Sequence, residues 1–276
     1  TALLGMNGAG KTTLIRLVTG QIRPTTGEVS VFGTSPWGNP DVFHRLGYCP
    51  EIDNFYEHLT GRQFVYQLAR MAGFDHIKAR RRTDEMIEKV GMADRADRSI
   101  AGFSKGMRQR IKLAQAMLHE PDIILLDEPL NGLDPVGRRE LMDLLGELAD
   151  RGKTIVVSSH ILFEVEQMTR NILLLHRGRL LATGDLRDIR ALIDKHPHRI
   201  RIDSPDLRPL AEKLVALPYV KSVDFLPGGR SIDLETREPD KFYDEVPKLV
   251  VEHDLKLEGF SSPDNNLEAV FRYLVG

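Results

Sequence analysis

Gly5-Met6-Asn7-Gly8-Ala9-Gly10-Lys11-Thr12 matches the pattern G-x-x-x-x-G-K-S/T. The apolar run Ala2 to Leu4 comes before it and the helical run Thr13 to Val18 comes after it, so the motif lies between a strand and a helix. Glycines let backbone N–H groups curl around phosphate oxygens, while a lysine meets the β- and γ-phosphates and a hydroxyl ligates Mg²⁺. The sequence therefore predicts a phosphate site with Thr12 on the metal, formed by Asn7, Gly8, Ala9, Gly10, Lys11, Thr12 and Thr13.

Two carboxylates follow the apolar run Ile123 to Leu126. A strand that ends in this way is a weak signal alone, but together with a phosphate loop it becomes a strong one. We expect Asp127 to hold Mg²⁺ and Glu128 to act as the general base, or as the group that orients the attacking water.

His160 comes at the end of a third predicted strand, after Ser158-Ser159. A histidine in such a place is more often structural than catalytic. Its position changes that balance, because Gly5, Asp127 and His160 all follow the carboxyl ends of predicted strands, where open α/β sheets bind ligands. We therefore expect His160 to contact the γ-phosphate and to belong to the catalytic group with Glu128.

Short apolar runs separated by turns and helical segments predict a parallel sheet with crossover helices. The expected strands are Ala2 to Leu4, Ile123 to Leu126, Thr154 to Val157 and Ile172 to Leu175. Between the first two lies a helical region, about residues 47–118, in which Met107, Ile111, Ala114 and Leu118 share one helix face. Arg177-Gly178 has the character of a hairpin turn that closes the sheet. The predicted fold class is α/β, a P-loop NTPase core with a helical subdomain.

A second unit is predicted after the polar, helix-breaking His196-Pro197-His198, which gives domains at 1–196 and 197–276. The expected elements are strand 199–203, helix 207–217, strands 220–226 and 231–235, helix 241–251, strand 255–260 and helix 267–274. The first six of these follow the order βαββαβ of a ferredoxin-like α+β domain. Its sequence carries no phosphate loop, catalytic constellation or metal spacing, so we expect an accessory regulatory or dimer-contact module.

The composition limits which partners the protein can bind and the cell compartment in which it is expected. The chain has 276 residues, a formal net charge of −2 and one cysteine, Cys49. A net charge of −2 gives no electrostatic reason to expect nucleic acid as a partner. The basic run from Lys78 to Arg82 is followed by acidic residues, which is typical of a solvated helix face. One cysteine excludes an internal disulfide and fits a reducing cytoplasm. No stretch approaches the ~18 apolar residues of a membrane span, so any membrane role is expected to be peripheral.

The segment Phe103-Ser104-Lys105-Gly106-Met107-Arg108-Gln109-Arg110 resembles the signature motif of the ABC ATPase family. The resemblance extends to Asn131-Gly132-Leu133-Asp134 as the D-loop, to His160 as the switch histidine and to Leu46-Gly47-Tyr48-Cys49-Pro50-Glu51 as the Q-loop, all in family order. It covers about residues 1–184. It implies ATP as the ligand and a head-to-tail dimer in which Ser104, Gly106 and Asp134 serve the nucleotide bound to the other subunit.

The sequence departs from the family pattern in three respects. Glu51 stands where the Q-loop usually has Gln, and Lys105 and Met107 replace a Gly and a Gln of the commonest signature. An ionised Glu only accepts hydrogen bonds, so Glu51 is expected to act through Mg²⁺ or a Mg²⁺-bound water. The adenine-stacking aromatic of the family lies upstream of the phosphate loop. Because the chain opens at Thr1 in a core strand without a Met, upstream strands are expected to be missing.

The Ser-Lys-Gly-Met signature, the single cassette and the C-terminal unit resemble ATP-binding subunits of ABC type 2 exporters. The predicted function is ATP hydrolysis that drives export through a separate permease, by a homo- or heterodimer on the inner face of the cell membrane. The groove at Phe55 to Leu59 would receive a permease helix, although Phe55 and Tyr56 could equally be core residues. The rivals are a soluble ABC ATPase of nucleic-acid or translation machinery, and a regulatory module that binds ATP without turnover.

Overall fold

The computed structural model describes residues 1–185 and 198–261. The chain divides into two compact units, Thr1–Leu180 and Leu181–Gly276, and each is described by itself. The predicted domain boundary at 196/197 lies among residues outside the described ranges and stays a prediction. In the described residues, no helix has the length and apolar character needed to cross a membrane.

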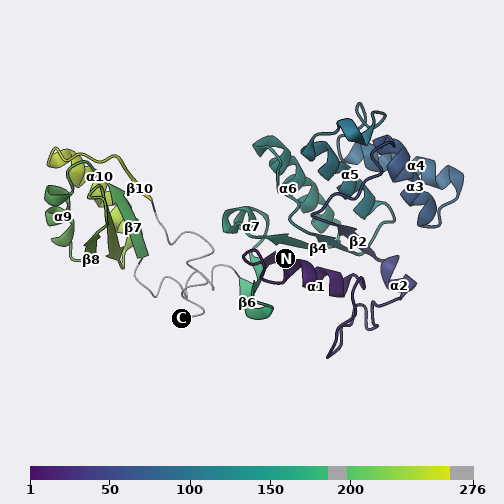
Figure 1. Cartoon of the computed structure of the whole chain (residues 1–276), viewed down its shortest axis with the longest axis horizontal. Coiled ribbons are helices and arrows are strands. Elements are labelled where there is room, and N and C mark those ends of the chain that lie inside the picture. The colour runs from purple at the N-terminus through teal and green to yellow at the C-terminus, as the bar shows by residue number, and fades with distance from the viewer. Residues whose placement is uncertain (186–197, 262–276) are drawn as a thin grey trace. The chain divides into compact units, whose positions relative to one another are not determined.

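A six-stranded sheet forms the centre of the first unit, in the order β2-β3-β4-β1-β5-β6 (Figure 1). Its strands are β1 (Ala2–Leu4), β2 (Leu46–Cys49), β3 (Ile123–Leu126), β4 (Thr154–Ser159), β5 (Asn171–His176) and β6 (Arg179–Asp185). Strands β1 to β5 pair in parallel, so their carboxyl ends meet at one edge. The four predicted strands and the hairpin at Arg177-Gly178 are confirmed, and both turn residues have the positive φ of a type I′ turn.

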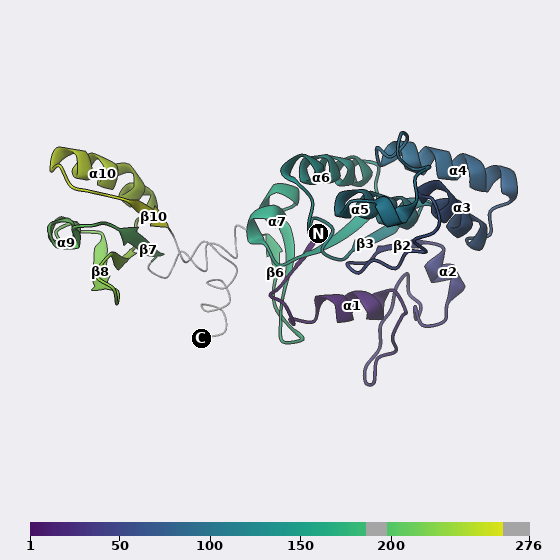
Figure 2. The ribbon, with the colours of Figure 1, turned by 45° about the horizontal axis from the view of Figure 1, so that its top comes forward.

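Helices cover both faces of this sheet, because neighbouring residues of a strand point to opposite sides. Leu125 of β3 belongs to a core with Ile15 of α1 (Lys11–Val18). The next residue, Leu126, belongs to a core with Leu141 of α6 (Pro135–Asp150) and Ile111 of α5 (Lys105–Met117). Figure 2 shows α1 on one side of the sheet and α5 and α6 on the other. The first unit is therefore a three-layer α/β/α core.

The helical subdomain packs around α5. Its other elements are α3 (Gly61–Met71), α4 (His76–Lys89) and the short helix Ile100–Gly102, while α2 (Pro40–Phe43) precedes β2 and α7 (Leu162–Met168) follows β4. The helices begin where side chains cap them: Thr60 and Gln63 form a capping box on α3, and Asp75 caps α4. Of the predicted helix face, Ile111 and Ala114 of α5 and Leu118 just after it are buried, and Met107 is partly buried against the same core.

The predicted start of the helical region at residue 47 is wrong, because Leu46–Cys49 forms strand β2 beside β3. The buried Leu46 and Cys49 fit this position, but four residues are too few to show a period of two. Gly47 allows the strand to approach α5, since a Cβ there would lie 2.1 Å from the carbonyl oxygen of Ala116. A close backbone approach of this kind requires glycine.

The described part of the second unit has the predicted ferredoxin-like order. It comprises β7 (His198–Asp203), α9 (Leu207–Val215), β8 (Val220–Phe225), β9 (Ser231–Thr236), α10 (Pro239–Glu252) and β10 (Gly259–Ser261), with an antiparallel sheet β10-β7-β9-β8. Ile200, Leu210 and Phe242 are in its core. The strand predicted at 255–260 is shorter than expected, because Leu255 and Leu257 pack against that core instead. The helix predicted at 267–274 lies outside the described residues.

Candidate active site

The phosphate loop is held in place by backbone hydrogen bonds from two directions. Gly5 N donates to Ser159 O at 3.2 Å, and Gly178 N of the hairpin turn donates to Ala9 O at 2.8 Å. Gly10, with φ 103°, immediately precedes α1. A Cβ on Gly5 would lie 2.8 Å from Leu175 O. The loop is thus fixed against the sheet before any ligand arrives, and its conformation requires glycine.

Nine predicted site residues line one pocket of about 240 Å³. They are Asn7, Gly8, Ala9, Gly10, Lys11, Thr12, Thr13, Glu51 and Glu128. The pocket is smaller than the roughly 300–1,000 Å³ typical of sites that enclose a whole small molecule, so it accommodates part of a nucleotide, in keeping with a phosphate site. The structure therefore brings Glu51 to the phosphate loop, although Glu51 follows Thr12, the last residue of the motif, by 39 positions in the sequence.

Lys11 joins the phosphate loop to the carboxylate pair. Its buried ammonium donates a hydrogen bond to Gly5 O at 2.6 Å and lies 3.1 Å from Glu128 Oε1. The side chains of both residues are less than a tenth exposed, at 6% and 7%. Charges buried this far are tolerated only when they are paired, so Lys11 and Glu128 stabilise each other where phosphate is expected to bind.

Asp127 is oriented by a serine that the sequence interpretation left without a role. Ser158 Oγ of β4 donates to Asp127 Oδ1 at 2.6 Å, while Asp127 Oδ2 is buried and has no hydrogen-bond partner in the described part of the chain. The buried carboxylate oxygen of Asp127 and the hydroxyl of Thr12 in the phosphate loop are oxygen donors of the kind that suits Mg²⁺. The residues therefore fit a magnesium ion, with Asp127 and Thr12 as candidates to hold it.

Glu128 has a backbone conformation uncommon for a residue with a side chain, φ 48°. Its N–H donates to Ser158 Oγ at 2.8 Å, which helps to hold this turn. One carboxylate oxygen, Oε2, lies 2.9 Å from His160 Nδ1, and the other, Oε1, accepts no hydrogen bond although it is close to Lys11. Glu128 and His160 are thus brought together, and the other carboxylate oxygen of Glu128 faces the Lys11 ammonium at 3.1 Å.

Two neutral side chains border the carboxylates. Burial raises the pKa of the Cys49 thiol to about 12, and burial together with the charge of Asp127 raises the pKa of Tyr48 to about 12. Both groups therefore keep their protons near neutral pH. Neither adds negative charge beside Asp127, where phosphate is expected.

Ser158→Ala tests the serine as an orienting residue. The change leaves the buried N–H of Glu128 without its acceptor, which should lower the free energy of unfolding by about 1–3 kcal/mol. Loss of a hydrogen bond that orients a metal ligand typically weakens metal binding by about 10–100-fold. Urea unfolding and a Mg²⁺ titration of the nucleotide complex measure the two effects. The matched control is Ser222→Ala, at the surface of the second unit, and a normal Mg²⁺ affinity in Ser158→Ala would contradict the role.

Five predicted site residues do not line the phosphate-loop pocket: Asp127 and His160, which contact Ser158 and Glu128, and Ser104, Gly106 and Asp134 of the signature and the D-loop. Ser104 caps α5, its Oγ accepting from Met107 N at 3.3 Å. Asp134 caps α6 in the same way, accepting from Gly137 N at 2.8 Å. Lys105, which replaces a glycine of the commonest signature, packs against the D-loop. A Cβ on Gly132 of the D-loop would be 2.3 Å from Lys105 Cδ. The signature and the D-loop thus contact each other within one chain.

A buried acid links the D-loop to the strand that leads to His160. Glu164 of α7 accepts a hydrogen bond from Ser159 Oγ at 3.2 Å and lies 3.0 Å from Arg138 of α6. Arg138 in turn donates to the D-loop carbonyl of Leu133 at 3.2 Å. The sequence analysis did not identify this network, because its members are ordinary helix residues whose partners are set only by the packing of α6 and α7.

The fold and the site define a P-loop nucleotide-binding protein. The family model described as ABC transporter matches residues 1–131. The chain is 42% identical over 180 residues to the bacitracin transport ATP-binding protein BcrA of Bacillus licheniformis, which covers 64% of this chain and 58% of that protein. It is 30% identical over 275 residues to the daunorubicin/doxorubicin resistance ATP-binding protein DrrA of Streptomyces peucetius, which covers 99% of this chain and 83% of that protein.

A solved structure of an ATP-binding subunit of an ABC transporter has a TM-score of 0.62 and 34% identity, over 69% of this chain and 80% of the other. The chain belongs to the family of ABC transporter ATP-binding proteins. This confirms the predicted family and fold, and it favours a transporter subunit over the nucleic-acid ATPase. The chain spans only 58% of the length of the Bacillus licheniformis relative.

Proposed function

We propose that this chain binds ATP with Mg²⁺ and hydrolyses it, as the energy-supplying subunit of a membrane exporter. The observation that carries the proposal is the buried carboxylate pair after β3: Asp127 Oδ2 has no hydrogen-bond partner among the described residues, and Glu128, 3.1 Å from the Lys11 ammonium, lines the phosphate-loop pocket. Phosphoryl transfer to water needs a cradle of backbone N–H groups, a lysine, a metal ligand and a group that orients the water. The presence of both carboxylates argues against a module that binds ATP without turnover.

The roles of the chain's own residues follow from their contacts. Mg²⁺, held by Asp127 and Thr12, would offset the charge of the phosphate oxygens. Lys11 is paired with Glu128 in the described structure. Incoming phosphates compete for the Lys11 ammonium, so nucleotide binding releases Glu128 to take a proton from the attacking water. His160, at 2.9 Å from Glu128 Oε2, keeps the carboxylate oriented.

The signature residues support action as a dimer. Ser104 and Asp134 begin helices α5 and α6 and lie outside the phosphate-loop pocket of their own chain. The N-terminal end of a helix favours negative charge, so these residues are suited to phosphate held by another subunit. We propose a head-to-tail pair with two composite sites, from two copies of this chain or from this chain and a related one.

The relatives favour export as the transport direction. Two relatives are named for bacitracin transport and for daunorubicin/doxorubicin resistance, and we propose that this chain acts on the inner face of the membrane with an export permease as its partner. The segment after the Q-loop carries two kinds of aromatic residue: Phe55 packs edge-on against Phe64 at 5.0 Å, whereas Tyr56 is 67% exposed. Tyr56 and the exposed Ile52 are therefore the candidates to contact a permease, whereas Phe55 is partly buried and packs against the core.

Purification of the full-length protein from membranes, with an ATPase assay, tests the proposal. We expect Mg²⁺-dependent ATPase activity and co-purification of an integral membrane protein. Bound nucleic acid in place of a membrane partner would favour the rival class of soluble ABC ATPases. Nucleotide binding without any turnover in that complex would favour the regulatory module.

Glu51→Ala should raise the Mg²⁺ concentration needed for half-maximal ATP hydrolysis and slow turnover, because the carboxylate lines the pocket beside Thr12 and Glu128. Glu51→Gln should remain active, since an amide oxygen can also ligate Mg²⁺. Mg²⁺ titrations of the ATPase rate for the parent and both variants measure this. Superimposable curves for the parent and Glu51→Ala would show Glu51 to be a solvated loop residue.

We propose that the second unit is a regulatory or dimer-contact module. Its sheet carries a ladder of opposite charges: Arg201 makes two hydrogen bonds to Asp233, and Arg199 and Lys221 both lie 3.6 Å from Glu235. A face neutralised in this way suits a polar protein contact better than a phosphate backbone. Deletion of residues 197–276 should alter dimerisation or coupling to transport and leave nucleotide contacts intact. Catalytic activity of the isolated unit would refute the proposal.

A further inference from the structure

Three side chains of α5 fasten this helix to the end of β2 and to the segment that follows it. Arg108 Nη1 donates to Glu57 Oε1 at 3.0 Å, and Gln109 Nε2 lies 3.5 Å from Cys49 Sγ. Lys112 Nζ donates to the backbone oxygen of Glu51 at 2.9 Å. The same segment carries the Glu51 side chain into the lining of the phosphate-loop pocket. The helix that begins at the signature is therefore tied directly to the metal side of the nucleotide site.

Lys112 is the best buried of the three and has a charged partner as well. Its side chain is 5% exposed, and its Nζ lies 2.9 Å from Asp53 Oδ1, so its two acceptors flank residue 52. Replacing a buried ion pair with apolar side chains of similar volume is often neutral or stabilising. Stability alone therefore does not explain a lysine at this place. A lysine also orients the segment, because its ammonium holds the Glu51 carbonyl and the Asp53 carboxylate in fixed positions.

We infer that Lys112 is a positioning residue for Glu51. By holding the Glu51 carbonyl, it sets where the Glu51 carboxylate lies in the pocket and makes Glu51 follow any movement of α5. Because Ser104 caps the same helix, phosphate bound at the signature of this chain changes the metal side of its own phosphate-loop pocket through Lys112. The inference rests on the proposed function and adds a mechanical link between the two nucleotide sites of the dimer.

Lys112→Met tests the link by a binding measurement that needs no turnover. Mn²⁺ is titrated by electron paramagnetic resonance into full-length protein saturated with a non-hydrolysable ATP analogue. Partners that orient a metal ligand typically contribute about 10–100-fold in metal affinity, so Mn²⁺ binding should weaken by that factor. Affinity for the analogue without divalent cation should be unchanged, since the phosphate loop is intact. Asp53→Asn, at a carboxylate that is one third exposed, should give a smaller loss in the same direction and keep the fold.

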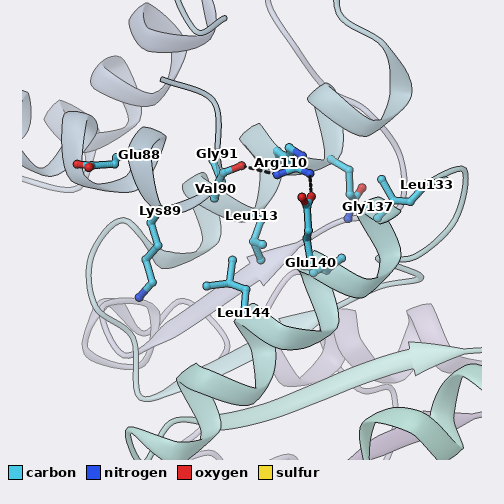
Figure 3. Close-up of a pocket in the computed structure, with 12 residues that line it drawn as sticks. Glu88, Lys89, Val90, Gly91, Arg110, Leu113, Leu133, Gly137, Glu140 and Leu144 are labelled. Carbon is cyan, nitrogen blue, oxygen red and sulfur yellow. Dashed lines mark hydrogen bonds and ion pairs between the residues drawn. The ribbon is translucent and has the colours of Figure 1, made fainter. Parts of the chain in front are cut away.

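A double-mutant comparison separates positioning from general destabilisation. If Lys112 acts through Glu51, Lys112→Met combined with Glu51→Ala should bind Mn²⁺ no more weakly than Glu51→Ala alone. Arg110→Met is the matched control on the same helix. Arg110 donates to Val90 O at 2.9 Å and pairs with Glu140 in a separate pocket formed with α4 and α6 (Figure 3). Its loss should lower the melting temperature without changing Mn²⁺ affinity.

The outcomes distinguish the inference from the function on which it rests. Parent-like Mn²⁺ affinity in both Lys112→Met and Asp53→Asn, with nucleotide bound, overturns the inference alone. So does a combined variant whose loss equals the product of the two single losses. A parent protein that binds neither the analogue nor the metal ion overturns the proposed function, and the inference with it.

Discussion

Glu128→Gln should lower the rate of ATP hydrolysis by about 10²- to 10⁴-fold, the usual contribution of a positioned general base. The amide keeps the shape of the side chain but cannot take a proton from water. ATP binding should survive, because Lys11 retains its hydrogen bond to Gly5 O and the loop is held by Ser159 and Gly178. With hydrolysis blocked, the ATP-bound dimer should accumulate, and size-exclusion chromatography with ATP should show it.

The chain offers a close control for this variant. Glu120 also has a left-handed backbone, φ 57°, and its exposed carboxylate pairs with Arg82 at 2.9 Å, at the surface. Glu120→Gln should therefore hydrolyse ATP at the parent rate. Near-normal turnover in Glu128→Gln would exclude Glu128 as the base, whereas a loss of ATP binding would show that its charge is needed to shape the pocket.

Lys11→Met should abolish tight nucleotide binding and also destabilise the nucleotide-free protein. The phosphates lose their cationic partner. The Glu128 carboxylate, which is only 7% exposed, loses the ammonium that lies 3.1 Å from it in the parent protein. Removing one partner of a buried ion pair typically costs about 3–5 kcal/mol. Adding Glu128→Gln to Lys11→Met should recover much of that stability, since no unpaired charge then remains, but it should not restore binding.

Urea unfolding of the two single variants and the double variant measures the stability effect, and titration with a fluorescent ATP analogue measures binding. A double variant no more stable than Lys11→Met would mean that the ion pair does not hold the empty site together. Unchanged nucleotide affinity in Lys11→Met would remove Lys11 from the phosphate site.

Local patterns account for what could be predicted. The phosphate loop is a contiguous motif between a strand and a helix, so its residues could be assigned before any tertiary contact was known. The same holds for Asp127 and Glu128 at the end of an apolar strand, and for the hairpin at Arg177-Gly178. The short strand Leu46–Cys49 was missed because four residues beside a long helical region show too little period. The strand predicted at 255–260 was too long, because an apolar residue can pack against a core without pairing with a neighbouring strand.

The sequence by itself determined the class of fold, the phosphate loop, the acidic strand end and the order of the family motifs, because each depends on neighbours along the chain. The tertiary structure decided which side chains act together. Ser158 reaches Asp127 across 31 positions, and Lys112 reaches Glu51 across 61. Packing also separated Phe55, which is partly buried against the core, from Tyr56, at the surface. Hydrogen bonds between distant segments form only once strands and helices are packed, so no local pattern could have indicated them.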